Sequence, residues 1–234
     1  MPILDAWDLQ LNIDQVLRAQ GANPDDIRSR RSDLVNTIEK AISIGKHFLH
    51  PRVLYEKYPV VNFVHDRLEL DSRNLKIGTH FLAGKLISQH LARAQEILVI
   101  CCTIGGELED HVGSLFKIDP GLAIALDGVG SAAVETLAIQ ACNHFENQVK
   151  NNGLTTTLPL NPGMIGWPVD QGQPQIFSLL DCEEIQVTIT DSWMMFPMKS
   201  LSMVLGIGDN LTTDGIPCEY CSLKGTCRYQ NHYA

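Results

Sequence analysis

The stretch of sequence that decides the fold is residues 158–208, which read LPLNPGMIGWPVDQGQPQIFSLLDCEEIQVTITDSWMMFPMKSLSMVLGIG. It predicts a turn-rich loop, a short amphipathic helix, an alternating strand, a second apolar loop and another strand. Pro162-Gly163 and Trp167-Pro168 fix a backbone path outside helix and sheet, because proline lacks an N–H and glycine reaches positive φ. If the two loops meet, their apolar side chains would line one small-molecule site. Those side chains are Met164, Ile165, Trp167, Trp193, Met194, Met195, Phe196 and Met198.

Three segments of this stretch follow one another in a fixed order: N-P-G-M-I-G-W-P, I-F-S-L-L-D and V-T-I-T-D-S-W-M-M-F-P-M-K-S-L-S. Their spacing resembles the activation (reactivation) domain of cobalamin-dependent methionine synthase, where R-x-S-P-G-Y-G-x-W-P precedes L-F-x-L-L and T-E-S-x-M-M-x-P-x-K-S-x-S. Residues 102–109 and 126–135 resemble it as well. The resemblance covers residues 95–208 and implies an α+β fold with a twisted, mainly antiparallel sheet flanked by helices.

The resemblance also implies a site for S-adenosylmethionine. The family's arginine, which faces the ligand's carboxylate, falls on Pro159, and proline offers no donor. Without compensation, the lost charge-assisted hydrogen bond would weaken binding by roughly 1.5–3 kcal/mol. The cofactor-binding residues that the resemblance assigns are Glu135, Asn161, Pro162, Gly163, Met164, Trp167, Asp191, Ser192, Met194, Met195 and Lys199.

Plainer interpretations of several of these residues remain open. Glu135 stands at the position of an acidic helix residue of the family, but a solvated helix carboxylate would give the same sequence. Lys199 is a candidate partner for a carboxylate, or a solvated surface lysine. Met194 and Met195 suit contact with a sulfonium ligand or a corrin edge, and equally suit core packing. No nucleophile, base and orienting group stand at a recognisable spacing, so no catalytic residue is assigned.

The end of the chain carries a separate signal. Cys218, Cys221 and Cys227 form C-x2-C-x5-C, a spacing that lets three thiolates converge on one metal centre. An iron–sulfur cluster is favoured over structural zinc, because reactivation of oxidised cobalt needs an electron, and plain reduced thiols are the alternative. Three ligands leave one position to fill. The candidates for it are Cys101, Cys102, Cys142, Cys182 and His232.

The composition narrows the class of protein. The 234 residues include 18 basic and 27 acidic side chains, so the formal net charge is −9. This charge repels a phosphate backbone and an anionic membrane surface, and we expect no nucleic-acid partner. We also expect no membrane partner, because no leader pattern and no apolar stretch of spanning length stand out. Seven cysteines, an odd number, favour a reducing compartment, and we expect a cytoplasmic protein.

In the first third of the chain, residues 7–12 alternate and predict a short strand, followed by a short helix that ends at Gly21. Asn23 is the expected cap of a long amphipathic helix that runs to about His50. Residues 51–78 predict a β-meander or hairpin.

Further along, Thr79 is the expected cap of a helix that carries Phe81, Leu82, Leu86 and Leu91. Residues 96–104 then predict a buried strand. A tight Gly-Gly turn and a short helix follow. Asp119-Pro120 opens a helical region that runs to about Asn151.

Together these patterns divide the chain into an N-terminal part of the domain (1–94), an activation-domain-like ligand-binding core (95–208) and a cysteine-rich tail (209–234). We predict an S-adenosylmethionine-binding activation protein that supports reductive methylation of a corrinoid-dependent methyltransferase such as methionine synthase. Its partner would be a corrinoid protein or a cobalamin-binding methionine synthase subunit. The alternatives are an iron–sulfur protein that reduces a corrinoid partner, and a non-catalytic corrinoid-protein binding module.

Overall fold

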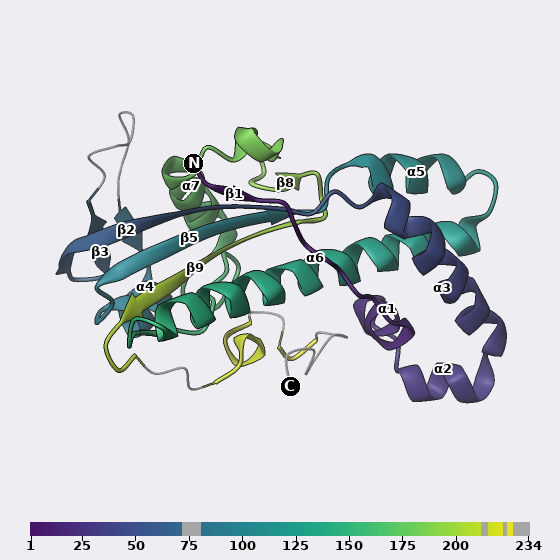
Figure 1. Cartoon of the computed structure of the whole chain (residues 1–234), viewed down its shortest axis with the longest axis horizontal. Helices are drawn as coiled ribbons and strands as arrows, with labels where there is room; N and C mark the ends of the chain where they lie inside the picture. Colours follow the sequence, from purple (N-terminus) through teal and green to yellow (C-terminus); the bar gives the residue numbers. More distant parts are fainter. Residues whose placement is uncertain (72–80, 212–214, 222–223, 227–234) are drawn as a thin grey trace.

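Three long strands form the middle of one antiparallel sheet (Figure 1): β2 (Arg52–Val64), β5 (Glu96–Thr103) and β9 (Ser200–Gly208). On β5, Thr103 stands opposite Arg52 on one side and opposite Ser200 on the other. The computed structural model describes residues 1–71, 81–211, 215–221 and 224–226.

Short strands extend this sheet at both edges. The strand order is β4-β3-β2-β5-β9-β6, β1 also pairs with β2, and every pairing is antiparallel. A separate two-stranded hairpin joins β7 to β8. The expectation of an α+β fold with a mainly antiparallel sheet is therefore confirmed. The short strands are β1 (Ile3–Leu4), β3 (Arg67–Leu70), β4 (Phe81–Ala83), β6 (Thr155–Thr156), β7 (Thr188–Ile189) and β8 (Met195–Phe196).

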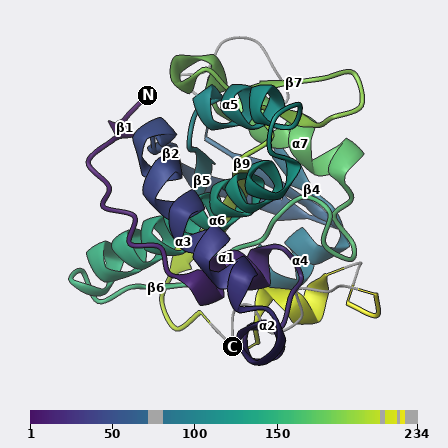
Figure 2. The same cartoon turned by 90° about the vertical axis from the view of Figure 1, so that its right-hand side faces the viewer.

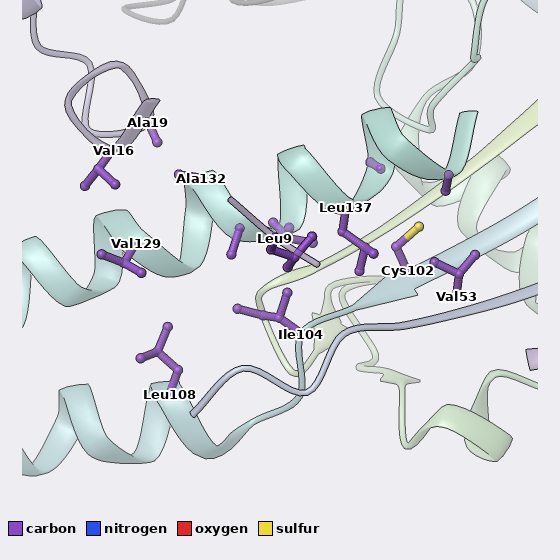
Figure 3. Close-up of a cluster of buried hydrophobic side chains, with 14 of the residues drawn as sticks. Leu9, Val16, Ala19, Val53, Cys102, Ile104, Leu108, Val129, Ala132 and Leu137 are labelled. Atoms are coloured by element: carbon purple, nitrogen blue, oxygen red, sulfur yellow. The ribbon is translucent and has the colours of Figure 1, made fainter. Parts of the chain in front are cut away.

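The side chains of β5 alternate between two hydrophobic cores, as the two-residue period of a strand requires. Leu98, Ile100 and Cys102 face one core, whereas Val99 and Cys101 face the other. Figure 3 shows part of the first core, where side chains of the sheet meet those of the helices. Because both faces are covered, all residues of β5 except its first are fully buried, as the apolar run predicted.

Helices cover each face of the sheet. The 31-residue helix α6 (Pro120–Lys150) runs along the first face, and Figure 2 views the molecule from the end where helices of the N-terminal half surround it. Two helices pack into the second core. The helices besides α6 are α1 (Ile13–Ala19), α2 (Pro24–Arg30), α3 (Ser32–Gly45) and α5 (Glu107–Leu115) on the first face, and α4 (Lys85–Leu91) and α7 (Val169–Leu179) on the second. The 3-10 turns are η1 (Lys46–Phe48), η2 (Cys182–Ile185) and η3 (Pro217–Tyr220).

Helix α6 begins where the sequence predicted, because Asp119 Oδ1 accepts a hydrogen bond from the backbone N–H of Leu122 at 3.0 Å. The expectation that no apolar stretch has spanning length was wrong for this helix. By length and composition alone, α6 could cross a membrane. However, 67% of its apolar window is buried inside the protein, where Val129, Leu137 and Phe145 pack in the first core. Core packing therefore accounts for its apolar surface.

Two expectations for the N-terminal region were wrong. Residues 7–12 form no strand; the backbone leaves the sheet after β1, and Leu9 is buried in the first core. The expected long helix breaks at Arg31, where φ is −142° and ψ is 61°. The break gives α3 its own direction, so that Ile38, Ala41 and Ile42 pack in the first core.

Two other segments differ from expectation. Phe81 and Leu82 belong to strand β4, which pairs with β3, because a hairpin partner outweighs the helical spacing of their side chains. Helix α4 begins only at Lys85, and the predicted cap Thr79 lies outside the described residues. The alternating strand predicted before the second loop is reduced to the two residues of β7.

The proposed division of the chain stays a prediction. Strand β2, before residue 94, and strand β5, after it, form one continuous ladder. The first two predicted parts thus contribute to the same sheet.

Candidate ligand-binding site

The loop of residues 158–168 is anchored along the outer edge of β9. Leu160 and Val204 exchange two backbone hydrogen bonds, each 2.9 Å long. One residue later, Asn161 Nδ2 donates to the carbonyl oxygen of Ser202 at 3.0 Å. The loop closes on itself, because Gly163 N–H, at a φ of 100°, donates to the carbonyl of Trp167 at 2.8 Å. The Asn161 side chain therefore bonds β9 at Ser202, in the first half of the strand.

Most apolar residues of this loop are part of the second core, whereas Ile165 is exposed. Trp167 is fully buried and Met164 nearly so. Trp167 Nε1 donates to Gln175 Oε1 at 3.2 Å, and the same amide bonds both backbone groups of Ala83 on β4. Pro162 packs against Gly172, where an added Cβ would lie 2.8 Å from the proline ring. Gln175 thus fixes the loop, β4 and α7 relative to one another.

Directly before β9, Lys199 is held by helix α6, which packs on the first face of the sheet. Its Nζ lies 2.8 Å from Asp127 Oδ1 and 2.9 Å from Ser131 Oγ. The Lys199 side chain is 14% exposed and Asp127 is 49% exposed, so the pair lies at the border between protein and water. The lysine stem crosses Gly130, where an added Cβ would meet Cγ and Cε at 3.3 Å. Lys199 is therefore paired and packed, which differs from a solvated surface lysine.

Glu135 lies one turn beyond Ser131 on the same face of α6. Helix α6 follows β9, because Ser131 contacts Lys199 and, further along, Cys142 Sγ lies 3.4 Å from Met203 Sδ. The half-buried Glu135 lies on α6 between these two contacts. Asn161 reaches β9 from the neighbouring loop, at the carbonyl of Ser202. Asn161 thus bonds the strand that α6, the helix of Glu135, follows.

Polar contacts also fix the turn that leads into β9. Glu109 Oε1 accepts from the backbone N–H of Lys199 at 2.7 Å. Burial raises the pKa of the Glu109 carboxyl, although this hydrogen bond opposes the shift. Ser200 Oγ lies 2.7 Å from the carbonyl oxygen of Pro197 and 3.0 Å from Thr103 Oγ1. The position of Lys199 is thus set by β5 and α5 as well as by α6.

The second predicted loop forms the β7–β8 hairpin, whose tip holds Asp191 and Ser192, both exposed. Met195 is half-buried against the second core. Trp193 is half-buried, and Met194, Phe196 and Met198 are 60%, 59% and 65% exposed. The apolar set predicted to line one site is therefore divided, because Met164 and Trp167 are buried whereas Ile165 and these three side chains are exposed.

The tail attaches to the first loop rather than to the hairpin. The backbone N–H of Ile165 donates to the carbonyl of Tyr220 at 2.7 Å, and Met164 forms a β-bridge with Cys221. Cys218 and Cys221 are free, half-buried thiols. Cys227 lies outside the described residues. Among the residues that the structure does describe, no group of three or more His, Cys, Asp or Glu side chains could hold a metal ion. The predicted three-cysteine metal site stays a prediction.

The core cysteines differ from those of the tail. Cys101, Cys102 and Cys182 are buried, and Cys142 is half-buried beside Met203. Burial raises the pKa of Cys102 and raises that of Cys142 to about 12, and the contact with Cys101 and burial raise that of Cys182. Burial thus favours the neutral thiol form of Cys102, Cys142 and Cys182. His232 lies outside the described residues.

Sequence reasoning missed several residues that fix the site. Asp127 and Ser131 hold Lys199, and Gln175 holds Trp167. The four-residue spacing of Asp127, Ser131 and Glu135 predicts that they share one polar face of a helix. Nothing in the local sequence of Gln175 indicated its role, because its partners are fixed by the tertiary structure.

Comparison with known proteins places this geometry in a known architecture. No family model matches the sequence, and no curated protein matches it significantly. Among solved structures, the MetH reactivation domain bound to AdoHcy is similar over 89% of this chain and 72% of that chain, with a TM-score of 0.61. The chain has a reactivation-domain fold. The two sequences are 15% identical over the match, so the similarity shows the fold, and the reactivation-domain architecture predicted from the sequence is confirmed.

Proposed function

We propose that this chain binds S-adenosylmethionine at the first half of β9 and supports reductive methylation of a corrinoid-dependent methyltransferase such as methionine synthase. The observation that carries the proposal is that Asn161 bonds β9 from a loop while α6, which carries Glu135, contacts Lys199 directly before this strand and Met203 within it. The similarity in fold to a domain solved with AdoHcy supports it. Cobalamin would be held by the partner protein.

The charges of this region suit a cationic ligand. S-adenosylmethionine carries a positive sulfonium and a positive ammonium group. Glu135 supplies a carboxylate on the helix that follows β9, whereas the carboxylate of Asp127 is neutralised by Lys199. The site offers fewer hydrogen-bond donors to the ligand's own carboxylate. Pro159 has no donor, and Lys199 Nζ is already bound to Asp127 and Ser131. We therefore expect weaker binding than a site with an arginine would give.

When bound, S-adenosylmethionine would supply a methyl group to reduced cobalt of the partner. This chain's residues would bind and orient the ligand, and no side-chain nucleophile is needed, because positioning can account for such a transfer. Asn161 would fix the loop that faces the ligand, and Lys199 would hold α6 and β9 at a constant spacing.

The hairpin surface formed by Met194, Phe196 and Met198 is our candidate for contact with the corrinoid protein. These three side chains are exposed and apolar, and Met198 directly precedes Lys199 in the candidate site. A methyl acceptor must reach the bound ligand, so the partner must cover surface next to that site. Flexible methionine side chains suit contact with a large apolar group.

The deciding experiment is calorimetric titration of anaerobically purified full chain with S-adenosylmethionine. We expect saturable one-to-one binding. Glu135→Gln should weaken it about fivefold or more, because the carboxylate charge is lost while the shape is kept. The control is Glu146→Gln on the same helix, where the carboxylate pairs with Lys150, and its affinity should match the wild type. Absence of binding at millimolar ligand would refute the proposal.

A second measurement separates this proposal from a non-catalytic binding module. Methylation of a reduced corrinoid protein is followed by its visible spectrum, with S-adenosylmethionine as the methyl donor. Met198→Ser should slow methylation while leaving the affinity for S-adenosylmethionine unchanged. Association with the corrinoid protein without methylation would instead favour the binding module.

A further inference from the structure

The C-x2-C segment of the tail is folded into one tight turn. Cys218 lies in η3 and Cys221 follows it, and the backbone N–H of Cys221 donates to the carbonyl of Cys218 at 3.4 Å. A turn closed between residues i and i+3 keeps their Cα atoms within about 7 Å. Disulfide-bonded cysteines have Cα atoms about 4.4–6.8 Å apart. The turn therefore holds two free, half-buried thiols near disulfide geometry.

This turn is attached by its backbone to the candidate ligand loop. The carbonyl of Tyr220, which stands between the two cysteines, accepts the hydrogen bond from Ile165 N–H at 2.7 Å. The Tyr220 ring meets the His90 ring of α4 edge-on, with centroids 4.7 Å apart. On the other side of Ile165, Met164 Sδ lies 3.4 Å from the backbone nitrogen of Asn161. The cysteine turn and Asn161, which bonds β9, are thus joined by successive contacts.

We propose that Cys218 and Cys221 form a redox-active dithiol, and that closing their disulfide changes the docking of Tyr220 on Ile165. A disulfide brings the two Cβ atoms to about 3.8 Å and fixes the torsion about the S–S bond. Tyr220 lies inside the ring that this bond closes, so any change in the turn acts directly on the carbonyl that accepts from Ile165 N–H. The loop around Asn161 then responds to the oxidation state of the tail, whether or not that loop binds S-adenosylmethionine.

The oxidation proceeds by thiol–disulfide exchange with a small-molecule disulfide, for which oxidised glutathione is the probe. One cysteine sulfur attacks the probe, the probe's S–S bond breaks, and one reduced glutathione leaves. The second cysteine sulfur then attacks the mixed disulfide and releases the second glutathione. The two thiol protons end on the two glutathione molecules. The dithiol has lost two electrons and the probe has gained two.

The test equilibrates the full chain in glutathione buffers of graded potential, traps free thiols with an alkylating reagent and maps disulfides by peptide mass spectrometry. We expect one two-electron transition that forms the Cys218–Cys221 disulfide while Cys101 and Cys102 stay reduced. A disulfide that uses Cys227, a lasting glutathione adduct alone, or a bound metal that prevents oxidation would each overturn the proposal.

Amide hydrogen exchange at Ile165 tests the coupling in the same samples. Exchange should differ about fivefold between the reduced and oxidised chain, the change expected when one ordinary hydrogen bond is lost. In Cys218→Ser and Cys221→Ser the rate should no longer depend on the buffer. Cys142→Ser, outside the tail, is the control and should behave as the wild type. Equal exchange in both states of the wild type would refute the coupling. No step uses S-adenosylmethionine, so the result is independent of the proposed function.

Discussion

Lys199 Nζ lies 2.8 Å from Asp127 Oδ1, and this pair ties the start of β9 to the N-terminal third of α6. The residues are far apart in the sequence, and neither belongs to a motif that pairs them. Because the backbone N–H of Lys199 also bonds Glu109, one residue connects α5, α6 and β9. The spacing of helix and strand at the candidate site depends on this residue.

Replacing Lys199 with methionine keeps most of the stem over Gly130 and removes the ammonium group. We expect the free energy of unfolding to fall by about 1–2 kcal/mol, because the ion pair and the bond to Ser131 are both lost. The control is Lys150→Met. Lys150 forms an exposed ion pair with Glu146 within α6, and this pair should contribute less than about 0.5 kcal/mol to the free energy of unfolding. Urea unfolding measures both, and equal losses would show that the Lys199 pair contributes no more than an exposed one.

Gly84 precedes α4 at a φ of 145°, and a Cβ there would lie 2.8 Å from the carbonyl oxygen of Gly166. Gly84→Ala should therefore destabilise the protein by about 2–3 kcal/mol, through backbone strain and displacement of the loop that holds Trp167. In contrast, Gly113 lies within α5 with nothing within 4 Å of its added Cβ. Gly113→Ala should stabilise by about 0.5–1 kcal/mol. Thermal unfolding distinguishes the two, and the opposite order would contradict the placement of the 158–168 loop.

The fold could be predicted from the sequence where local sequence signals agree with the tertiary structure. The buried run of β5 and the capped start of α6 at Asp119 were both predicted, and the motifs of residues 158–208 pointed to the reactivation-domain architecture. The break at Arg31 was not readable, because apolar residues continue at helical spacing on both sides of it. Only the position of α6 explains why the helix must change direction there.

The resemblance assigned Glu135 and Asn161 to the candidate site, and this assignment stays a prediction. In the structure Asn161 bonds β9, and Glu135 lies on the helix that follows this strand. The contacts that hold this region together could not be predicted from the sequence. Lys199 and Ser131 are 68 positions apart, and Gln175 and Ala83 are 92 positions apart. Such pairs arise from strand order and helix placement. The hydrogen bond that attaches the tail at Tyr220 to Ile165 could not be predicted either, because it also depends on the tertiary structure.

Gln175 joins three elements through one amide group, so its replacement should lower the stability of the protein. Gln175→Ala leaves the backbone N–H of Ala83 and the Nε1–H of Trp167 without their partner. We expect a loss of about 2–3 kcal/mol in urea unfolding, since buried donors left unpaired are costly. Gln171→Ala, an exposed position on the same helix, should change stability by less than about 0.5 kcal/mol. Similar values for both variants would mean that water replaces the amide.

Glu109 gives the protein a specific pH dependence. Burial raises the pKa of its carboxyl above the usual value of 4.5, so the folded state binds the proton more tightly than the unfolded state. The stabilisation from this group is present at low pH and is lost as pH rises through the folded-state pKa. In Glu109→Gln that loss is absent, and the amide can still accept from Lys199 N–H. We therefore expect the variant to gain stability relative to the wild type as pH rises from 4 to 7.

Urea unfolding at a series of pH values checks this expectation. The control is Asp110→Asn, the exposed neighbour on the same turn of α5, in which the loss assigned to Glu109 should remain. A stability difference between Glu109→Gln and the wild type that stays constant with pH would show that the two states bind this proton equally.

The charge of the sulfur atom offers a final test of the proposed ligand site. S-adenosylmethionine carries a positive sulfonium, whereas the sulfur of S-adenosylhomocysteine is neutral, and the remaining groups are shared. If Glu135 faces the sulfonium, Glu135→Gln should weaken binding of S-adenosylmethionine about fivefold more than binding of S-adenosylhomocysteine. Parallel calorimetric titrations of both ligands measure the ratio of their affinities, and Glu146→Gln should leave that ratio unchanged. An equal loss for both ligands would place Glu135 near the shared ammonium group instead, and no loss would remove it from the site.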